Sequence, residues 1–145
     1  MRALGVDLGS KRIGLATSDR SGTIATPLVV LQRSGSRATD HQAIARIVEE
    51  YEIECVVVGL PLNMNGSKGE AAKSALIEVD QLTSVLSVPV LTFDERRTTV
   101  TADHVLMQQN LNAQERRKVI DKVAAAVLLQ SWLDCRNSAK DAEHD

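Results

Sequence analysis

The hydrophobic pattern of this chain changes between residues 31 and 39, and that change limits the folds that the chain can adopt. Before the change, apolar residues alternate with small or polar ones in short runs, as in strands joined by tight turns. After it, continuous apolar runs alternate with helical patterns, and such runs are typical of strands buried on both faces. A meander of strands followed by strand–helix–strand units predicts one mixed sheet flanked by helices.

The first part of the pattern predicts three antiparallel strands. We expect them over residues 3–8, Arg12 to Ser18 and Ile24 to Leu31. Their connections are too short for a crossover, so neighbouring strands run in opposite directions. Pro27 has no N–H group to donate to a neighbouring strand, which places the third strand at an edge of the sheet.

The second part predicts helices that alternate with two buried, parallel strands. We expect helices from Thr39 or Asp40 to about Tyr51, from about Gly69 to Leu86, from Thr98 to Gln109 and from about Ala113 to Cys135, and strands over Cys55–Val58 and Val88–Phe93. The fold class is therefore α/β, with a mixed five-stranded sheet made of an antiparallel three-strand meander and two parallel strands. A length of 145 residues suits one domain, over residues 1–136, and we expect the polar tail 137–145 to fray.

The composition excludes several classes of protein. No stretch approaches the roughly 20 apolar residues of a membrane span, and the N-terminus has no signal-peptide layout, so we expect a cytoplasmic protein. A net charge of −2 argues against coating nucleic acid by bulk charge. Tyr51, Phe93 and Trp132 are the only aromatic residues, which are too few for a base-stacking platform.

The cysteines and histidines show no metal-ligand spacing. Cys55 lies in an apolar run and is expected to be buried, whereas an intermolecular disulfide at Cys135 is left open. We expect ordinary surface positions for the histidines, which are His41, His104 and His144.

Asp7 is a charged residue within the first strand, on the face that also carries Gly5 and Gly9. A charge inside a sheet is costly unless it is paired or binds a metal ion, and the flanking glycines leave room for a large ligand. The alternative is an ion pair with a nearby basic residue.

Two further acidic positions can meet Asp7. Asp94 and Glu95 follow the second parallel strand, and ligand sites in open α/β sheets favour the carboxyl ends of strands. Asp121 lies at the edge of the apolar stripe of the last helix, beside an alanine-rich segment that lets the helix lie close to the sheet. The alternatives are a solvated loop for Asp94 and Glu95, and a boundary carboxylate paired with a neighbouring lysine for Asp121.

Three carboxylates at one end of a sheet would repel one another without a cation. Oxygen ligands favour hard ions such as Mg²⁺ or Mn²⁺, and such an ion can activate a water and stabilise the oxygen that leaves a phosphate. Basic residues lie near each acid in the sequence, namely Lys11, Arg12, Arg96, Arg97, Arg116, Arg117, Lys118 and Lys122. Acids that hold a metal, surrounded by bases that hold phosphates, predict a nuclease. Bases on a solvated face are the alternative.

Four motifs resemble, in the same order, those of one known family. They are VDLGSKRIGLA at 6–16, VGLPLNMNGS at 58–67, DERRTT at 94–99 and DKVAAA at 121–126. The chain resembles the YqgF family, also called RuvX, whose members are RNase H-like proteins described as Holliday junction resolvases or pre-16S rRNA processing nucleases. The resemblance covers residues 3 to about 134. The first motif alone is weak because sugar kinases and actin-like ATPases share it, but four motifs in order are specific.

The resemblance implies an RNase H-like fold and a set of site residues. The implied catalytic and metal-binding acids are Asp7, Glu95 and Asp121, with Mg²⁺ or Mn²⁺ as cofactor and Asp94 left open as the middle ligand. The expected nucleic-acid contacts are Lys11, Arg12, Arg96, Arg97, Arg116, Arg117 and Lys118, and the loop near the site includes Asn63, Asn65, Gly66 and Ser67. That loop either binds phosphate through backbone N–H groups or is a mobile segment beside the site.

One position departs from RNase H enzymes proper. Those enzymes place an acid at the end of the fourth strand, where this chain has Gly59, Leu60 and Pro61. The site here would therefore draw that acid from the fifth strand.

The sequence thus predicts a metal-dependent endonuclease of structured nucleic acid. The favoured role is processing of the 5′ end of pre-16S rRNA in ribosome biogenesis, and the alternative is resolution of four-way DNA junctions. The expected partners are structured RNA or branched DNA and ribosomal precursor particles. The protein is a monomer or a homodimer, and a stable dimer would favour a resolvase, which needs two symmetric sites. A non-catalytic binding module is the alternative from another class; an actin-like ATPase is disfavoured because it needs two such domains.

Overall fold

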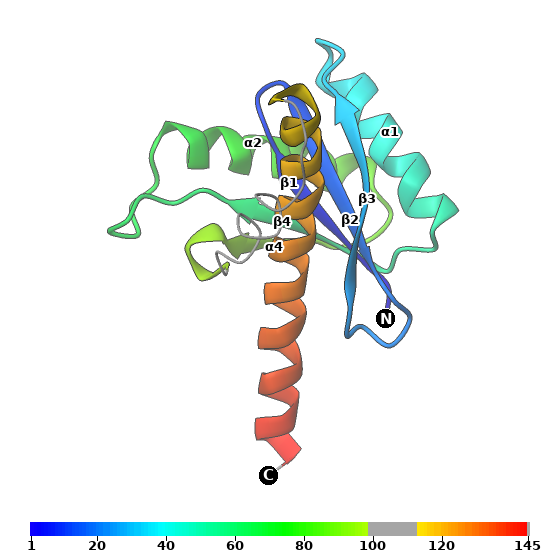
Figure 1. The fold of residues 1–145 in the computed structure, drawn as a ribbon, viewed down its shortest axis with the longest axis vertical. Helices are drawn as coiled ribbons and strands as arrows, with labels where there is room; N and C mark the ends of the chain where they lie inside the picture. The colour runs from blue at the N-terminus through cyan, green and yellow to red at the C-terminus, as the bar shows by residue number, and fades with distance from the viewer. Residues whose placement is uncertain (99–112, 145) are drawn as a thin grey trace.

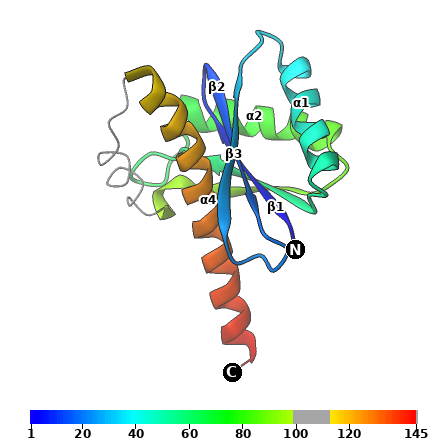
Figure 2. The ribbon, with the colours of Figure 1, turned by 45° about the vertical axis from the view of Figure 1, so that its right-hand side comes forward.

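The computed structural model describes residues 1–98 and 113–144, with side chains described for residues 1–98 and 123–139. In this part of the chain a five-stranded sheet separates two helical layers (Figures 1 and 2). Helices α1 and α2 cover one face of the sheet, and the long helix α4 crosses the other. No helix among the described residues is long and apolar enough to cross a membrane.

The sheet has the predicted mixed topology. Its strands are β1 (Ala3–Leu8), β2 (Arg12–Ser18), β3 (Ala25–Gln32), β4 (Cys55–Leu60) and β5 (Val90–Asp94). They lie in the order β3-β2-β1-β4-β5, with the first two pairs antiparallel and the last two parallel. The helices are α1 (Arg37–Glu50), α2 (Glu70–Val85), the short 3-10 helix η1 (Glu95–Arg97) and α4 (Ala113–His144). Pro27 therefore lies on an edge strand, as predicted.

Helix α1 begins earlier than the sequence suggested. Its N-cap is Ser36, whose side-chain oxygen accepts a hydrogen bond from the Thr39 N–H group at 3.3 Å. Asp40 lies in the first turn and is buried. The predicted cap at Thr39 or Asp40 was wrong because Ser36 offers the same kind of side-chain oxygen three positions earlier.

Two other expectations changed, and one was not tested. Strand β5 is the second edge of the sheet, and Leu91 and Thr92 are exposed, so the expected burial of this strand was wrong. Helix α4 continues past Cys135 to His144, beyond the predicted end. The helix expected over Thr98–Gln109 lies outside the described residues after Thr98.

Helix α4 lies directly against the backbone of β1. A Cβ atom on Gly5 would lie 2.8 Å from the Leu129 Cβ atom and 2.9 Å from the Ala125 carbonyl oxygen. No residue with a side chain fits at this point without a shift of the helix. The alanine-rich segment of α4 therefore does approach the sheet closely.

Gly5→Ala should lower the free energy of unfolding by about 1–3 kcal/mol, because its methyl group would overpack this contact. The atoms that it would meet belong to a backbone and to a Cβ atom, so neither can rotate away. Urea unfolding of wild type and variant measures the effect, and equal midpoints and slopes would contradict the close approach of α4.

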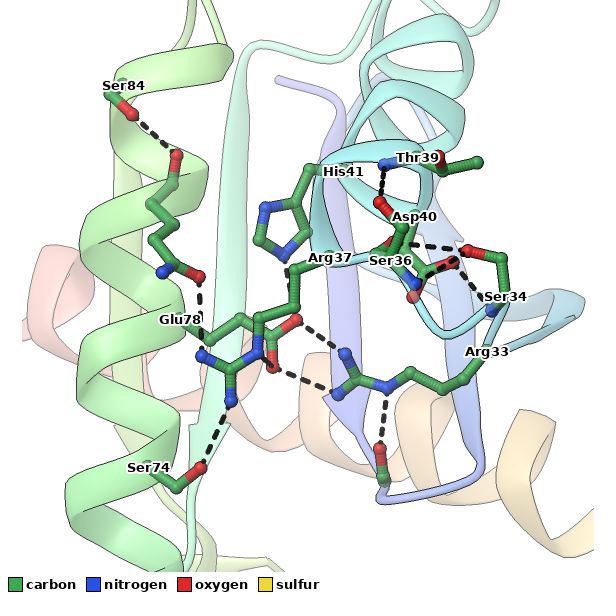
Figure 3. Close-up of polar contacts among 12 residues, drawn as sticks. Arg33, Ser34, Ser36, Arg37, Thr39, Asp40, His41, Ser74, Glu78 and Ser84 are labelled. Atoms are coloured by element: carbon green, nitrogen blue, oxygen red, sulfur yellow. Dashed lines mark hydrogen bonds and ion pairs between the residues drawn. The ribbon is translucent and has the colours of Figure 1, made fainter.

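On the other face of the sheet, a buried carboxylate on α2 joins that helix to α1 and to the segment after β3. Glu78 of α2 is 2% exposed and accepts hydrogen bonds from Arg33 at 2.7 and 3.0 Å (Figure 3). Nε2 of His41 lies 2.7 Å from the same carboxylate, so His41 is buried rather than at the surface as expected. Burial raises the pKa of Glu78, but the hydrogen bonds from Arg33 and His41 outweigh burial and hold that pKa below its usual value.

Glu78→Gln should destabilise the protein by about 3 kcal/mol near neutral pH, because Arg33 would lose the charged partner of a buried pair. The pKa of Glu78 is lower in the folded than in the unfolded chain, so its charge stabilises the fold above the unfolded value. That stabilisation is lost as pH falls through the lowered value. The stability difference between variant and wild type should therefore narrow below about pH 4. Urea titrations of both proteins at neutral and acidic pH measure this difference in the free energy of unfolding. An equal difference at both pH values would contradict the stabilising role of the Glu78 charge.

Candidate active site

Asp7 and Glu95 come together at one end of the sheet, on the face that α4 crosses. Asp7 is partly buried near the end of β1 and shares a face with Gly5, which contacts α4. Glu95 begins η1, directly after β5. The negative charge of Asp7 acts on the carboxyl group of Glu95, so the two acids share one local environment.

The side chain of Glu95 occupies the space above Gly59 of β4. A Cβ atom on Gly59 would lie 2.6 Å from Oε1 and 3.0 Å from Cγ of Glu95. Gly59 pairs with Phe93 near the end of the parallel ladder. The glycine leaves a notch that the Glu95 carboxylate fills, so the segment after β5 supplies the acid above the end of β4.

The electrostatics of this pair suit a bound cation. Burial raises the pKa of Glu95 above its usual value, and the negative charges of Asp7 and Asp94 raise it further. A divalent cation would favour the ionised forms of both acids, and their oxygen atoms suit Mg²⁺ or Mn²⁺. Among the side chains that the structure describes, no three acidic, histidine or cysteine groups lie close enough to hold a metal ion.

Asp94 has a different environment from its neighbour Glu95. Its carboxylate accepts the backbone N–H of Arg96 at 2.9 Å, which caps η1, and contacts Nη2 of the same guanidinium at 2.6 Å. Hydrogen bonds from the Arg96 side chain hold the pKa of Asp94 below its usual value. Asp94 is therefore bound by a cation of the protein itself, whereas Glu95 lies near other acids.

Arg96 also holds the loop that follows β4. Its Nη1 atom donates a hydrogen bond to the Met64 carbonyl oxygen at 3.2 Å, and Met64 itself is 94% exposed. Hydrogen bonds within this turn join Asn63, Asn65, Gly66 and Ser67. The loop is thus a hydrogen-bonded turn attached to the segment that carries Glu95.

The basic residues predicted from the sequence occupy three kinds of position. Arg97 lies over the Phe93 ring, 5.2 Å from its centroid, and donates to the Cys135 Sγ atom at 3.2 Å. Arg96 and Arg97 therefore both have partners within the protein, which their order in the chain could not reveal. Lys11 is exposed in the turn after β1, and Arg12 is partly buried at the start of β2.

The remaining predicted site residues fall where the structure describes the backbone only. They are Asp121, Arg116, Arg117 and Lys118, all in the first half of α4. Along α4, Ala125 lies against Gly5, and Asn137, further on, donates to the carbonyl oxygen of Gly22 beside Met1. The helix therefore runs toward the start of β1. Asp121, one turn before Ala125, lies toward the Asp7 end of that strand.

Proteins of one known family are similar in sequence to this chain over nearly its full length. The family model described as "RuvX: Holliday junction resolvase" matches residues 1–135. A protein of Thermoanaerobacter pseudethanolicus named "Putative pre-16S rRNA nuclease" is 42% identical over 139 residues, which cover 95% of this chain and 99% of that protein. A protein of Rhodococcus opacus with the same name is 45% identical over 145 residues, covering 97% of this chain and 82% of that protein.

Solved structures share the fold at low sequence identity. RuvC of Thermus thermophilus, in complex with a Holliday junction substrate, matches with a TM-score of 0.59 at 17% identity, covering 95% of this chain and 96% of that one. A second structure of Thermus thermophilus RuvC has a TM-score of 0.56 at 16% identity, covering 95% of this chain and 97% of that one. These similarities concern the fold, which is RNase H-like as predicted.

Proposed function

The chain belongs to the RuvX family of nucleases, and from that membership we propose that it is a metal-dependent endonuclease that processes the 5′ end of pre-16S rRNA. The observation that carries the proposal is the pair of Asp7, near the end of β1, and Glu95, which follows β5 and reaches over Gly59 of the intervening strand β4 into the field of the Asp7 charge. The name shared by relatives at 42% and 45% identity supports RNA as the substrate.

In this proposal Asp7, Glu95 and Asp121 hold Mg²⁺ or Mn²⁺. When bound, the ion activates a water and stabilises the oxygen that leaves the phosphate. Burial, and then the charges of Asp7 and Asp94, raise the pKa of Glu95, and this supports its role as the middle acid because a bound cation would favour the ionised carboxylate. Asp94 is better suited to hold η1 in place, since Arg96 already binds its carboxylate.

We assign the contacts with nucleic-acid phosphates to basic residues around these acids. Lys11 and Arg12 follow Asp7 in the turn after β1 and the start of β2, and Arg116, Arg117 and Lys118 precede Asp121 in α4. Arg12, Arg96 and Arg97 each have an interaction within the protein, which the substrate would replace. We place the protein in the cytoplasm, on ribosomal precursor particles, as a monomer or a homodimer.

Incubation of the purified protein with a 5′-extended 16S rRNA fragment and with a four-way DNA junction tests the proposal. Each substrate is supplied with Mg²⁺, Mn²⁺ or EDTA. We expect cleavage of the RNA with either metal and none with EDTA. Cleavage of the junction alone would support the resolvase, which the family description favours. If neither substrate is cleaved, the proposed nuclease activity is wrong, and the alternative of a non-catalytic binding module is favoured.

A further inference from the structure

A cavity lies at the same end of the sheet as the acid pair, on the opposite face. It has a volume of about 460 Å³ and lies between the end of β1, the loop before α1 and helix α2. Small residues leave this space open, among them Gly9, Gly35, Ala71 and Ala75. Its volume lies within the roughly 300–1,000 Å³ typical of small-molecule sites, so one nucleotide unit fits.

Arg37 is a cation that this cavity presents to a ligand. Its side chain is 43% exposed, and its Nε atom lies 3.9 Å from Oε1 of Glu78. Its hydrogen bonds to Gln81 and Ser74 are both 3.4 Å long (Figure 3). Arg33, by contrast, directs its guanidinium at Glu78 and at the Gly9 carbonyl oxygen. A guanidinium held as loosely as that of Arg37 can turn its N–H groups toward a phosphate.

Asp40 adds a buried acceptor to the wall of the same cavity. The residue is 5% exposed, and its Oδ1 atom accepts the Ser34 N–H group at 3.0 Å. An ionised carboxylate offers about four lone-pair sites, so Asp40 can accept further hydrogen bonds from a molecule in the cavity. A ligand hydroxyl group is a donor of the right kind for this carboxylate.

We propose that this cavity binds one ribose–phosphate unit of an RNA strand, with the phosphate on Arg37 and the 2′-hydroxyl group donating to Asp40. This assignment rests on the proposed function, which takes RNA as the substrate. Gly9 and Ser10 line the cavity just after Asp7, and Pro61 lines it just after β4. A strand that crosses the ends of β1 and β4 can therefore contact both the acid pair and the cavity. Because DNA lacks the 2′-hydroxyl group, the cavity favours RNA.

Binding measured in the Asp7→Asn background tests the proposal without cleavage. Fluorescence anisotropy compares a single-stranded RNA with DNA of the same sequence. Arg37→Ala should weaken binding of both strands about tenfold and lower the salt slope by about one. The matched control is Arg46→Ala, which removes an exposed arginine from the same helix outside the cavity and should change neither value. Equal effects of the two substitutions would overturn the role of Arg37.

Asp40→Asn tests the ribose contact. The asparagine keeps an oxygen for the Ser34 N–H group but can present an amide group in place of the second acceptor. Loss of the charge acts on RNA and DNA alike, so the informative value is the ratio of the two affinities. We expect the preference for RNA to fall about fivefold or more, and an unchanged ratio would overturn the ribose contact.

Two further measurements keep the test decisive. Ser74→Asp places a carboxylate beside Arg37 on the exposed side of α2, and should weaken binding of both strands as Arg37→Ala does. This variant tests the cavity even if Asp40→Asn fails to fold. Ser84→Asp on the same helix is its control. If a free ribonucleoside monophosphate competes for Arg37 as well as the RNA strand does, the cavity is a nucleotide site and the proposal is wrong. If the protein binds RNA more tightly than DNA but cleaves neither, the proposed nuclease activity is wrong, whereas the proposed ribose–phosphate site is supported.

Discussion

Asp7→Asn should lower the cleavage rate by roughly a thousandfold while the protein stays folded. The substitution keeps the shape of the side chain but removes one of the charges that would hold the metal ion. It also removes a charge that raises the pKa of Glu95, so the folded state loses a repulsion. Cleavage rates with Mg²⁺ and Mn²⁺, together with thermal unfolding, measure both effects.

Asp80→Asn is the matched control for this variant. Asp80 is an exposed acid on α2, on the other side of the sheet, and its substitution should leave the cleavage rate unchanged. Wild-type cleavage by the Asp7→Asn protein would show that the site lies elsewhere. Loss of folding in that variant would show that Asp7 is part of a stabilising ion pair.

Gly59→Ala should lower the cleavage rate by roughly a hundredfold with little loss of stability, because misplacement of a catalytic group by about 1 Å can cost that much. The new methyl group would meet the Oε1 atom of Glu95 at 2.6 Å. This atom is the end of a flexible side chain, so the carboxylate moves aside and leaves the position near Asp7. Gly59→Ala should lower the cleavage rate more than the free energy of unfolding. Gly5→Ala should instead lower the free energy of unfolding, because its methyl group would meet a carbonyl oxygen and a Cβ atom that cannot rotate away.

Moving the acid from η1 to β4 tests the same contact in the opposite direction. Glu95→Ala alone should be inactive, whereas Gly59→Asp combined with Glu95→Ala should recover part of the activity. The reason is that a carboxylate on residue 59 would begin from a Cβ atom only 2.6 Å from the present position of Oε1. Full activity of Gly59→Ala would mean that the position of Glu95 above Gly59 is unimportant for cleavage.

The parts of the fold set by local pattern could be predicted from the sequence. The bounds of β1 and β2 follow from alternation and a tight turn, and the edge position of β3 follows from Pro27. The cap of α1 was placed wrongly because several side chains near residue 36 can accept the same hydrogen bond. The exposure of β5 depends on what packs against it, which its own residues do not record.

Contacts between distant residues explain what the sequence left open. Asp94 and Glu95 are adjacent, so only the guanidinium of Arg96 on one and the notch at Gly59 under the other give them different environments. His41 and Glu78 are separated by 37 residues, and neither has a neighbour in the sequence that points to the other. A lone histidine with no ligand spacing therefore suggested a surface position.

The contact of Gly5 with Ala125 and Leu129 joins segments that a ribosome makes far apart in time. Strand β1 is made early, whereas α4, which packs on this face, follows all five strands of the described sheet in the chain. Asp121, the proposed third acid, is carried by α4 and is therefore made after every strand of the described sheet. In the proposed site, the order of the elements along the chain would set the order in which the three acids can be brought together.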